Sequence, residues 1–372
     1  MAVDARWLLL SKPLRAPLRD GTTVLASSLV QALPDEIDVA YLGDPETPLR
    51  PGHDRVLPAL AVGYAPGFLD RARLLMTLVD PRLRKLGVHL FFSPNRASQT
   101  VLAGVRRTAP GRRFVQTIPA SDGAEAHAAA LRGLDAVVVT SDHARSKLIG
   151  CGLADDRVHT IHPGIAIPKH AERDPASSKR LLYAGDLDEA AAGRLLVLAR
   201  LLRRPELAGW KLTIAARPKS PEDARARATV RRELAGDLAD GRVELAAEVA
   251  DMDALLRSSA LLVYLADHVK KKVDLPLVLL EGLARGIGVA ALDIDPLAEI
   301  FGIADAERLE VGMRLSPRDP ERAAQTLVTA VTDPARLRKW GADARTLAER
   351  RFSAARMAAQ YLELYAALER AP

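Results

Sequence analysis

Two series of short apolar runs, separated by one polar stretch, constrain the fold of this chain more than any other feature. In the first half such runs recur at residues 7–11, 37–42, 88–92, 114–118, 136–140 and 158–161. In the second half they recur at residues 180–185, 211–216, 242–245, 261–266, 288–292 and 312–316. Helical or loop segments lie between the runs. Continuous apolar strands that alternate with helices predict parallel sheets covered on both faces, here two doubly wound α/β domains in tandem.

The polar stretch is the predicted domain boundary. It reads KHAERDPASSK at residues 169–179 and has no apolar periodicity. We therefore predict an N-terminal domain at 1–166, a linker at 167–179 and a C-terminal domain at 180–350. The final segment, 351–372, is amphipathic by pattern, and we expect a helix there that packs back on the N-terminal domain. A length of 372 residues is enough for two domains that each bury a core.

The composition indicates the cellular compartment of the protein. The only cysteine is Cys151, the sequence has no Cys/His cluster with zinc-ligand spacing, and the apolar run near the start is shorter than the core of a signal peptide. These features favour the cytoplasm, with peripheral contact at the inner face of an anionic membrane left open.

The charge distribution leaves several partners open. The formal net charge is +6, and much of the excess lies between Arg71 and Arg113, where ten basic residues face the single acid Asp80. Nucleic acid, an anionic membrane, a phosphate-bearing substrate or a solvated face would each account for it. Aromatic residues are only 4% of the chain and do not interleave with the arginines, so we expect no nucleic acid.

The segment KKKVDLPLVLLEGLARG, residues 270–286, is the most informative for chemistry. Open α/β sheets bind ligands at the carboxyl ends of their strands, so two such domains predict a site in a cleft between the sheets. We expect Asp274 to cap a helix here and Pro276 to occupy its first turn. A helix N-terminus beside Lys270, Lys271 and Lys272 would suit a diphosphate, although three lysines are also common on solvated surfaces.

Glu281 is the only charged residue between Leu275 and Ala284. A carboxylate on an otherwise apolar helix needs a partner that offsets its desolvation. Ribose hydroxyls would serve. An intrahelical ion pair with Arg285, four residues later, would serve equally.

Four stretches in order along the chain resemble glycosyltransferase family 4. PLRDG (17–21) is similar to the N-terminal glycine loop, and SDHARSKLIGCGLADDRVHTIHPGI (141–165) to the end of the first domain. RVELAAEVADMDALLRSSALLVYLA (242–266) is similar to the segment before the donor loop, and KVDLPLVLLEGLARGIGVAALDIDPLAEI (272–300) to the donor-site signature. The resemblance implies the GT-B architecture, two Rossmann-like domains facing a cleft.

The resemblance also implies roles for residues. Glu281 falls on the second glutamate of the family's Glu-(seven residues)-Glu motif, which holds the nucleotide ribose. The donor-side candidates that follow from the match are Glu281, Lys272, Asp274, Leu277, Val278 and Gly185. The candidates on the acceptor side are Gly21, His89 and Asn95.

The sequence departs from the family pattern at three places. Val273 stands where the first glutamate of the motif is expected, and Pro119 where many relatives have a histidine. The loop GDLDEAAAG after Gly185 lacks the arginine and lysine that neutralise the donor phosphates in many relatives. The catalytic residues stay unassigned, and the three lysines are the candidate replacements.

We therefore predict a glycosyltransferase of the hexosyltransferase type, with a role in polysaccharide biosynthesis. It would move a sugar from a UDP- or GDP-sugar to a glycan, lipid-linked or small-molecule acceptor, with retention, without a metal and with no cofactor. A degenerate GT-B protein that binds without transfer and a sugar-nucleotide epimerase stay open as alternatives. Three Asp-x-Asp triplets would suit a metal-dependent GT-A enzyme, but two alternating halves do not fit that layout, and Asp251 and Asp253 are typical of helix caps.

Overall fold

The computed structural model describes residues 7–16, 18, 20–58, 69, 76, 78, 86–95, 103–104, 106–107, 111–169, 174–269 and 272–370. The chain divides into two compact units. The first unit consists of Met1–Ile165, Lys270–Leu275 and Phe352–Pro372. The second unit consists of Ala166–Val269 and Pro276–Arg351.

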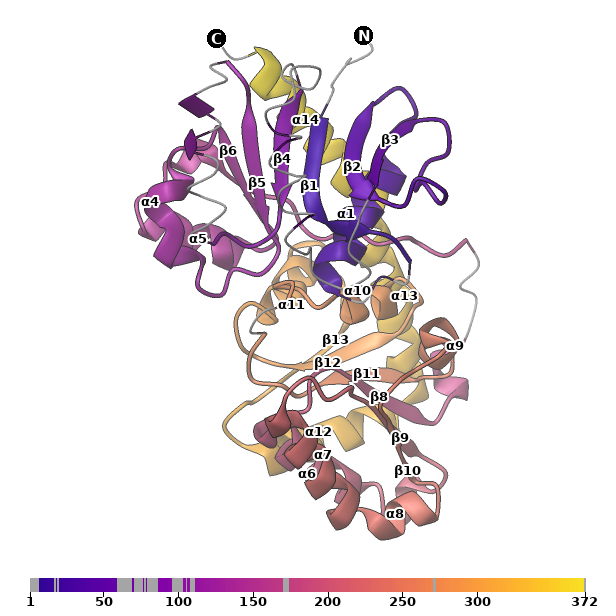
Figure 1. Ribbon diagram of the computed structural model, residues 1–372. Coiled ribbons are helices and arrows are strands. Elements are labelled where there is room, and N and C mark those ends of the chain that lie inside the picture. Colours follow the sequence, from indigo (N-terminus) through magenta and orange to yellow (C-terminus); the bar gives the residue numbers. More distant parts are fainter. Residues whose placement is uncertain are drawn as a thin grey trace. The chain divides into compact units, whose positions relative to one another are not determined.

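The first unit is built on a seven-stranded parallel sheet (Figure 1). Its strands are β1 (Trp7–Leu14), β2 (Val39–Gly43), β3 (Asp54–Pro58), β4 (Gly87–Phe91), β5 (Phe114–Ile118), β6 (Ala136–Val139) and β7 (Val158–Thr160). The order across the sheet is β3-β2-β1-β4-β5-β6-β7. The strand order therefore reverses between β1 and β4, which makes this the switch point of the first sheet.

The helices of the first unit cover strands that are buried on both faces. All four residues of β6 (AVVV) are buried, as expected for a central strand of a covered parallel sheet. The described helices are α1 (Gly21–Ala32), α4 (Ala128–Leu131), α5 (Asp142–Gly150) and α14 (Ala354–Arg370), with short 3₁₀ turns at Ala124–His127 and Asp155–Arg157. Asp20 begins α1 by accepting a hydrogen bond from the Thr23 amide, and Ser141 begins α5 by accepting one from the Ala144 amide.

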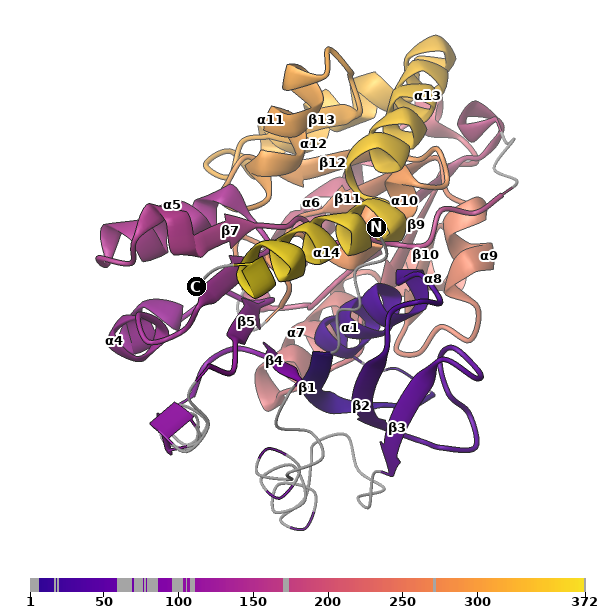
Figure 2. The same ribbon diagram turned by 90° about the horizontal axis from the view of Figure 1, so that it is seen from above.

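Helix α14 completes the core of the first unit, although it lies at the other end of the sequence from β1. The rings of Trp7 and Tyr365 stack with their centroids 4.0 Å apart. The Tyr361 hydroxyl lies 2.8 Å from the hydroxyl of Thr117 on β5. Figure 2 shows α14, in yellow, running alongside α1. A C-terminal segment thus supplies aromatic side chains to the N-terminal sheet.

The second unit is built on a six-stranded parallel sheet. Its strands are β8 (Arg180–Ala184), β9 (Lys211–Ala215), β10 (Val243–Ala246), β11 (Leu261–Tyr264), β12 (Gly288–Leu292) and β13 (Gly312–Leu315). The order across the sheet is β10-β9-β8-β11-β12-β13, so the switch point lies between β8 and β11. These two strands pair directly through Leu181 with Leu261 and Leu182 with Leu262.

Side-chain caps fix where several helices of the second unit begin. The helices are α6 (Glu189–Leu201), α7 (Pro221–Glu233), α8 (Ala235–Ala239), α9 (Met252–Arg257), α10 (Leu277–Leu283), α11 (Ala298–Ala306), α12 (Pro320–Val331) and α13 (Pro334–Arg351), with 3₁₀ turns at Pro175–Ser177 and Pro205–Leu207. Asp188, Ser220, Asp251 and Asp319 cap α6, α7, α9 and α12 in that order. The prediction that Asp251 is a helix cap is confirmed, whereas Asp253 lies within the first turn of α9 and does not cap it.

The predicted α/β class with two doubly wound parallel sheets is confirmed. Every apolar run predicted to be a strand overlaps one of the thirteen described strands. Strand β3 was not predicted, because three of its five residues are only partly buried and the other two are exposed. Within the part of the chain that the structure describes, the helices are all too short or too polar to cross a lipid bilayer.

Candidate functional site

The candidate site of the second unit lies at the carboxyl ends of β8 and β11. Gly185 follows β8 directly, and residues 265–268 follow β11. Because the strand order reverses between these strands, their loops diverge and leave room for a ligand at this edge. A side-chain carbon at Gly185 would lie 3.2 Å from the Tyr264 ring and 3.3 Å from the Tyr183 hydroxyl. Gly185 therefore keeps the first loop close to the sheet, as a loop that approaches a ligand through its backbone would require.

Glu281 lies on α10, and its carboxylate is not held by the expected ion pair. The guanidinium of Arg285 instead donates from Nε to Asp253 Oδ1 at 2.7 Å and from Nη1 to the backbone carbonyl of Glu281 at 2.9 Å. Among the described residues, the carboxylate oxygens of Glu281 have no hydrogen-bond donor within bonding distance and form no salt bridge. The intrahelical pair that the sequence left open is therefore not formed through the carboxylate.

Burial raises the pKa of Glu281 above its ordinary value of 4.5. The positive charge of Arg285 opposes this shift in pKa, and the nearby carboxylate of Asp253 adds to it. A partly buried carboxylate without a donor is costly, and it is available to accept hydrogen bonds from ligand hydroxyl groups.

Asp274 has a different role from the one predicted for it. It does not cap α10, which begins at Leu277 with Pro276 in the capping position and no side-chain cap. The Asp274 carboxylate instead accepts from the amide and hydroxyl of Ser121, both at 2.9 Å, and from the Ser141 hydroxyl at 2.7 Å. Its own amide donates to the carbonyl of Pro119 at 3.0 Å. Three strong donors from the ends of β5 and β6 outcompete the weak local preference for a cap, and the N-cap prediction for Asp274 was wrong.

The other donor-side candidates divide between the two units. Lys272 lies with Asp274 in the segment that belongs to the first unit. Leu277 and Val278 form the first turn of α10 in the second unit, where Leu277 is buried and Val278 is partly exposed. Lys270 and Lys271 lie outside the described residues.

Three acid–base pairs, which the sequence analysis did not find, line the edge of the second sheet beside Gly185. Asp186 Oδ1 accepts from Lys219 Nζ at 2.8 Å, and Asp267 Oδ2 from Arg194 Nη2 at 3.4 Å. Asp188 Oδ2 lies 3.2 Å from His268 Nε2. Side-chain atoms of Asp188, Asp267 and His268 come within 4.8 Å of one another, a spacing that a metal could use. Arg194 offsets the charge of Asp267, and we assign no metal here.

The topology also brings two acceptor-side candidates to the switch point of the first sheet. Gly21 is the first residue of α1, which follows β1, and Asn95 is an exposed residue after β4. Next to Gly21, Asp20 pairs with Lys12 of β1 at 3.2 Å.

His89 is placed in the core of the first unit. It lies within β4 and is fully buried. Its Nδ1 lies 2.5 Å from the Tyr365 hydroxyl and its Nε2 lies 2.7 Å from the Thr117 hydroxyl. Burial lowers the pKa of His89 to about 3, so the ring is neutral near pH 7. In this position His89 anchors α14 and has no surface that a substrate can reach.

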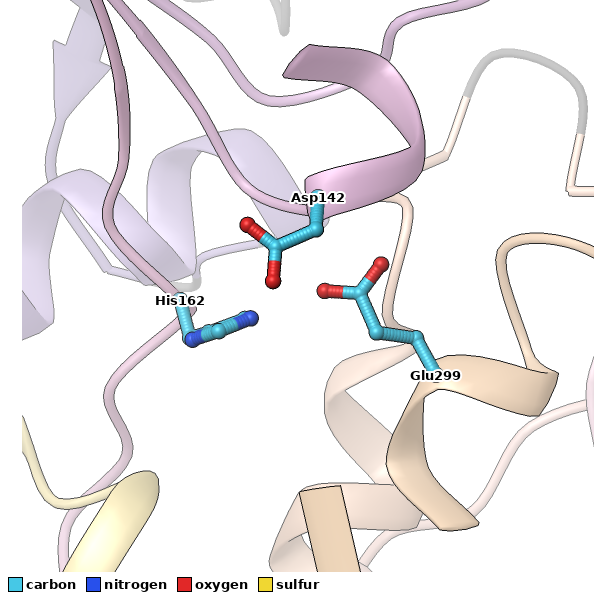
Figure 3. Close-up of side chains that lie close together, drawn as sticks. All are labelled: Asp142, His162 and Glu299. Atoms are coloured by element: carbon cyan, nitrogen blue, oxygen red, sulfur yellow. The ribbon is translucent and has the colours of Figure 1, made fainter. Parts of the chain in front are cut away.

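A carboxylate and an imidazole also meet in the first unit. Figure 3 shows Asp142, at the start of α5, and His162, after β7, with their side chains turned toward each other. Their ligand atoms lie within 4.8 Å. Both belong to the stretch 141–165 that carried part of the resemblance, although no role was predicted for either. Glu299, labelled in the same figure, is in the first turn of α11 in the second unit.

Most of the basic residues between Arg71 and Arg113 lie outside the described residues. Of those that are described, Arg112 is buried and donates to the carbonyls of Leu78 and Leu86. Arg113 forms a salt bridge with Asp135 at 3.4 Å. These two residues therefore have structural partners within the unit.

Residues 178–333 match the family model of glycosyl transferases group 1. No curated protein matches the chain in sequence. The matched segment includes Gly185, the three acid–base pairs and Glu281, so the family match covers the candidate site of the second unit.

Several solved structures are similar to this chain in fold. HepE from Anabaena, in complex with UDP-glucose, has 16% identity and a TM-score of 0.70 over 97% of this chain and 99% of its own. A glycosyltransferase from Rickettsia africae has 14% identity and a TM-score of 0.69 over 99% of this chain and 100% of its own. Sucrose-phosphate synthase from Thermosynechococcus elongatus has 19% identity and a TM-score of 0.69 over 98% of this chain and 99% of its own.

These similarities establish the fold as GT-B. Because the sequence identity is so low, these structures do not show which substrate this chain uses. The family match over residues 178–333 supports the prediction that the chain is a transferase of the glycosyltransferase type.

Proposed function

We propose that this protein transfers a sugar from a nucleoside-diphosphate sugar to a hydroxyl group of an acceptor, with retention and without a metal. The observation that carries the proposal is Glu281. It lies inside the segment that matches the glycosyltransferase family model, it is partly buried, and its carboxylate has no donor among the described residues. Vicinal ribose hydroxyls would supply two donors to such a carboxylate.

The other donor contacts follow from the switch point of the second sheet. Gly185 would let the first loop approach the diphosphate through its backbone, and the first turn of α10, with Leu277 and Val278, would lie along the nucleotide. Lys272 would add positive charge for the leaving diphosphate. HepE was solved with UDP-glucose, which makes UDP-glucose a suitable first donor to test.

The first unit would bind the acceptor. Gly21 and Asn95 stand at the switch point of its sheet, where an α/β domain binds ligands. The excess of basic residues in this half of the sequence suits a phosphorylated or lipid-linked acceptor. A cytoplasmic protein with peripheral access to an anionic membrane would meet both substrates.

Calorimetric titration in EDTA tests the donor site. UDP, GDP, UDP-glucose and GDP-mannose are titrated into the wild-type protein, the Glu281→Ala variant and the Glu321→Ala variant. We expect one nucleotide series to bind with a Kd of about 1–100 µM, and Glu281→Ala to weaken that binding about 10- to 100-fold. Glu321 is an exposed residue of α12, and replacing it controls for the loss of a carboxylate from the same unit.

Two outcomes would overturn the proposal. Binding that appears only when the titration is repeated with Mg²⁺ or Mn²⁺ in place of EDTA would contradict the metal-independent mechanism. An absence of binding to all four compounds by a folded wild-type protein would instead favour a chain that keeps the fold without the donor site, in line with Val273 and the missing cations after Gly185.

A further inference from the structure

The loop that joins β8 to α6, residues 185–188, lies against two buried tyrosines. Tyr183 belongs to β8 and Tyr264 to β11, and their ring centroids are 6.2 Å apart. Both tyrosines lie beyond the last paired residues of these two strands, where the strands diverge. A side-chain carbon at Gly185 would lie 3.2 Å from the Tyr264 ring and 3.3 Å from the Tyr183 hydroxyl. The loop therefore begins in direct contact with both tyrosine side chains.

The Tyr183 hydroxyl holds the backbone of this loop. It donates a hydrogen bond to the carbonyl oxygen of Asp186, three residues later. Burial raises the pKa of Tyr183 well above its ordinary value of 10.0, so the hydroxyl stays protonated and remains a donor. A side chain at Gly185 would press on this hydroxyl. Glycine at this position thus leaves room for the bond between Tyr183 and the Asp186 carbonyl.

This hydrogen bond fixes the direction of one backbone amide. The carbonyl of Asp186 and the N–H of Leu187 belong to the same peptide group, which is planar and trans, so they point in opposite directions. Because the carbonyl points at a buried hydroxyl, the N–H points away from the tyrosine. Among the described residues, this N–H has no hydrogen-bond acceptor.

The loop borders solvent at the position of this amide. Gly185, Asp186 and Asp188 are partly exposed, whereas Leu187 is 2% exposed and its side chain is buried. A backbone N–H without a partner in such a place is costly. An anionic oxygen is the strongest acceptor that could satisfy it.

Both ends of the loop are also anchored. The Gly185 amide donates to the Ala215 carbonyl of β9 at 3.3 Å. At the other end, Asp188 caps α6 by accepting from the Ala191 amide at 2.7 Å. Between these two anchors, the bond from Tyr183 sets the orientation of the peptide group that carries the free amide.

We propose that Tyr183 is a positioning residue of the donor site, whose hydroxyl turns the Leu187 amide toward a phosphate oxygen of the donor. The inference rests on the proposed function, because it takes the diphosphate to lie at the loop that begins with Gly185. It adds a backbone group that binds the diphosphate and the side chain that orients this group. Tyr183 acts through the loop and does not touch the ligand, because it is fully buried.

The first test removes the hydroxyl and keeps the ring. Of UDP-glucose and GDP-mannose, the probe that binds wild-type protein more tightly is titrated calorimetrically into Tyr183→Phe. We expect its affinity to fall about fivefold. The affinity for the matching nucleoside, uridine or guanosine, measured by ligand-observed NMR, should not change because a nucleoside has no phosphate. Since Tyr183→Phe changes no charge, the electrostatic contributions of Asp186, Lys219, the lysines at 270–272 and every other charged group are the same in both proteins.

Tyr41→Phe is the matched control for a loss of stability. Tyr41 is buried in β2 of the first unit, and its hydroxyl accepts from the Leu49 amide at 2.7 Å. This variant also loses a buried tyrosine hydroxyl, but its affinity for the probe should equal that of the wild type. The phosphorus NMR resonances of the bound probe should shift in Tyr183→Phe and stay in place in Tyr41→Phe.

A second test removes the amide itself. Nonsense suppression with the α-hydroxy analogue of leucine at Leu187 replaces the N–H by an ester oxygen and keeps the side chain. We expect this ester variant to bind the probe about tenfold more weakly than the wild type. In the Tyr183→Phe background the further loss should be much smaller, because both changes act on the same peptide group.

Several outcomes would overturn the inference and leave the proposed function intact. They are wild-type affinity for the probe in Tyr183→Phe or in the ester variant, an equal loss of affinity for the nucleoside, an equal loss in Tyr41→Phe, and strict additivity of the two changes. Failure of the wild-type protein to bind either sugar nucleotide would overturn both.

Discussion

Asp274 and Glu281 are two carboxylates from the same short stretch of sequence, and their hydrogen bonding differs. Asp274, 2% exposed, accepts three hydrogen bonds from Ser121 and Ser141 and belongs to the first unit. Glu281 belongs to the second unit and has no donor on its carboxylate among the described residues. A satisfied buried carboxylate ties backbone segments together, whereas an unsatisfied one reduces stability and is useful only to a ligand.

The largest effect is expected from Asp274→Ala. The substitution would leave the Ser121 amide and two serine hydroxyls without their acceptor, and would lower the free energy of unfolding by about 3 kcal/mol. Chemical denaturation of the full chain measures this, with Asp122→Ala, at an exposed neighbouring position, as the control. Equal stability of the two variants would mean that the Asp274 bonds contribute nothing net.

Glu281→Gln should change stability in the other direction. Glutamine has nearly the shape of glutamate but no charge to desolvate, so the variant should be more stable than the wild type near pH 7 by about 1 kcal/mol. The denaturation midpoint of the second unit measures the gain, and Glu321→Gln serves as the matched control. A loss of stability would show that the charged carboxylate has a structural partner after all.

The sign of the pH dependence follows from the raised pKa of Glu281. In the unfolded chain this group ionises near 4.5, and in the folded protein it ionises at higher pH. The folded state therefore binds the proton more tightly, and ionisation reduces stability as the pH rises through the folded pKa. The gain in the free energy of unfolding from Glu281→Gln should be largest above that pKa and should decrease as the pH falls toward 4.5.

The smallest effect is expected from Arg285→Gln. It would remove the bond to Asp253 and the bond to the Glu281 carbonyl, at a cost of about 0.5 kcal/mol. Since Arg285 also lowers the pKa of Glu281 by its charge, the cost should shrink further when Glu281 is already glutamine. A double-mutant cycle measures this coupling. If the two changes in the free energy of unfolding were strictly additive, the charge of Arg285 would not affect Glu281.

Local patterns were sufficient to predict the strands and several helix starts. Apolar runs identify covered parallel strands because most side chains between sheet and helix are apolar. The half-exposed edge strand β3 lacks that signal. Capping by Asp251 was equally predictable, because the cap and the amide it binds are three residues apart.

The site could be predicted only in part, because its contacts join residues that are distant in sequence. Arg285 was expected to pair with the Glu281 carboxylate, yet it turns to Asp253, 32 residues away. The donors to Asp274 lie more than 130 residues before it. The position of His268 directly after an apolar strand, combined with Asp188 after the first strand of the same domain, was the one signal that could have indicated their pairing.

The position of α14 sets an order of events during synthesis. The Trp7 ring is covered by Tyr365, and His89 on β4 is hydrogen-bonded to the same tyrosine. When the ribosome has completed residue 165, the seven strands of the first unit exist, but their aromatic cover is still two hundred codons away. The ribosome synthesises the second unit, which ends at Arg351, before it reaches α14. During that time the sheet of the first unit exposes the apolar face that α14 later covers.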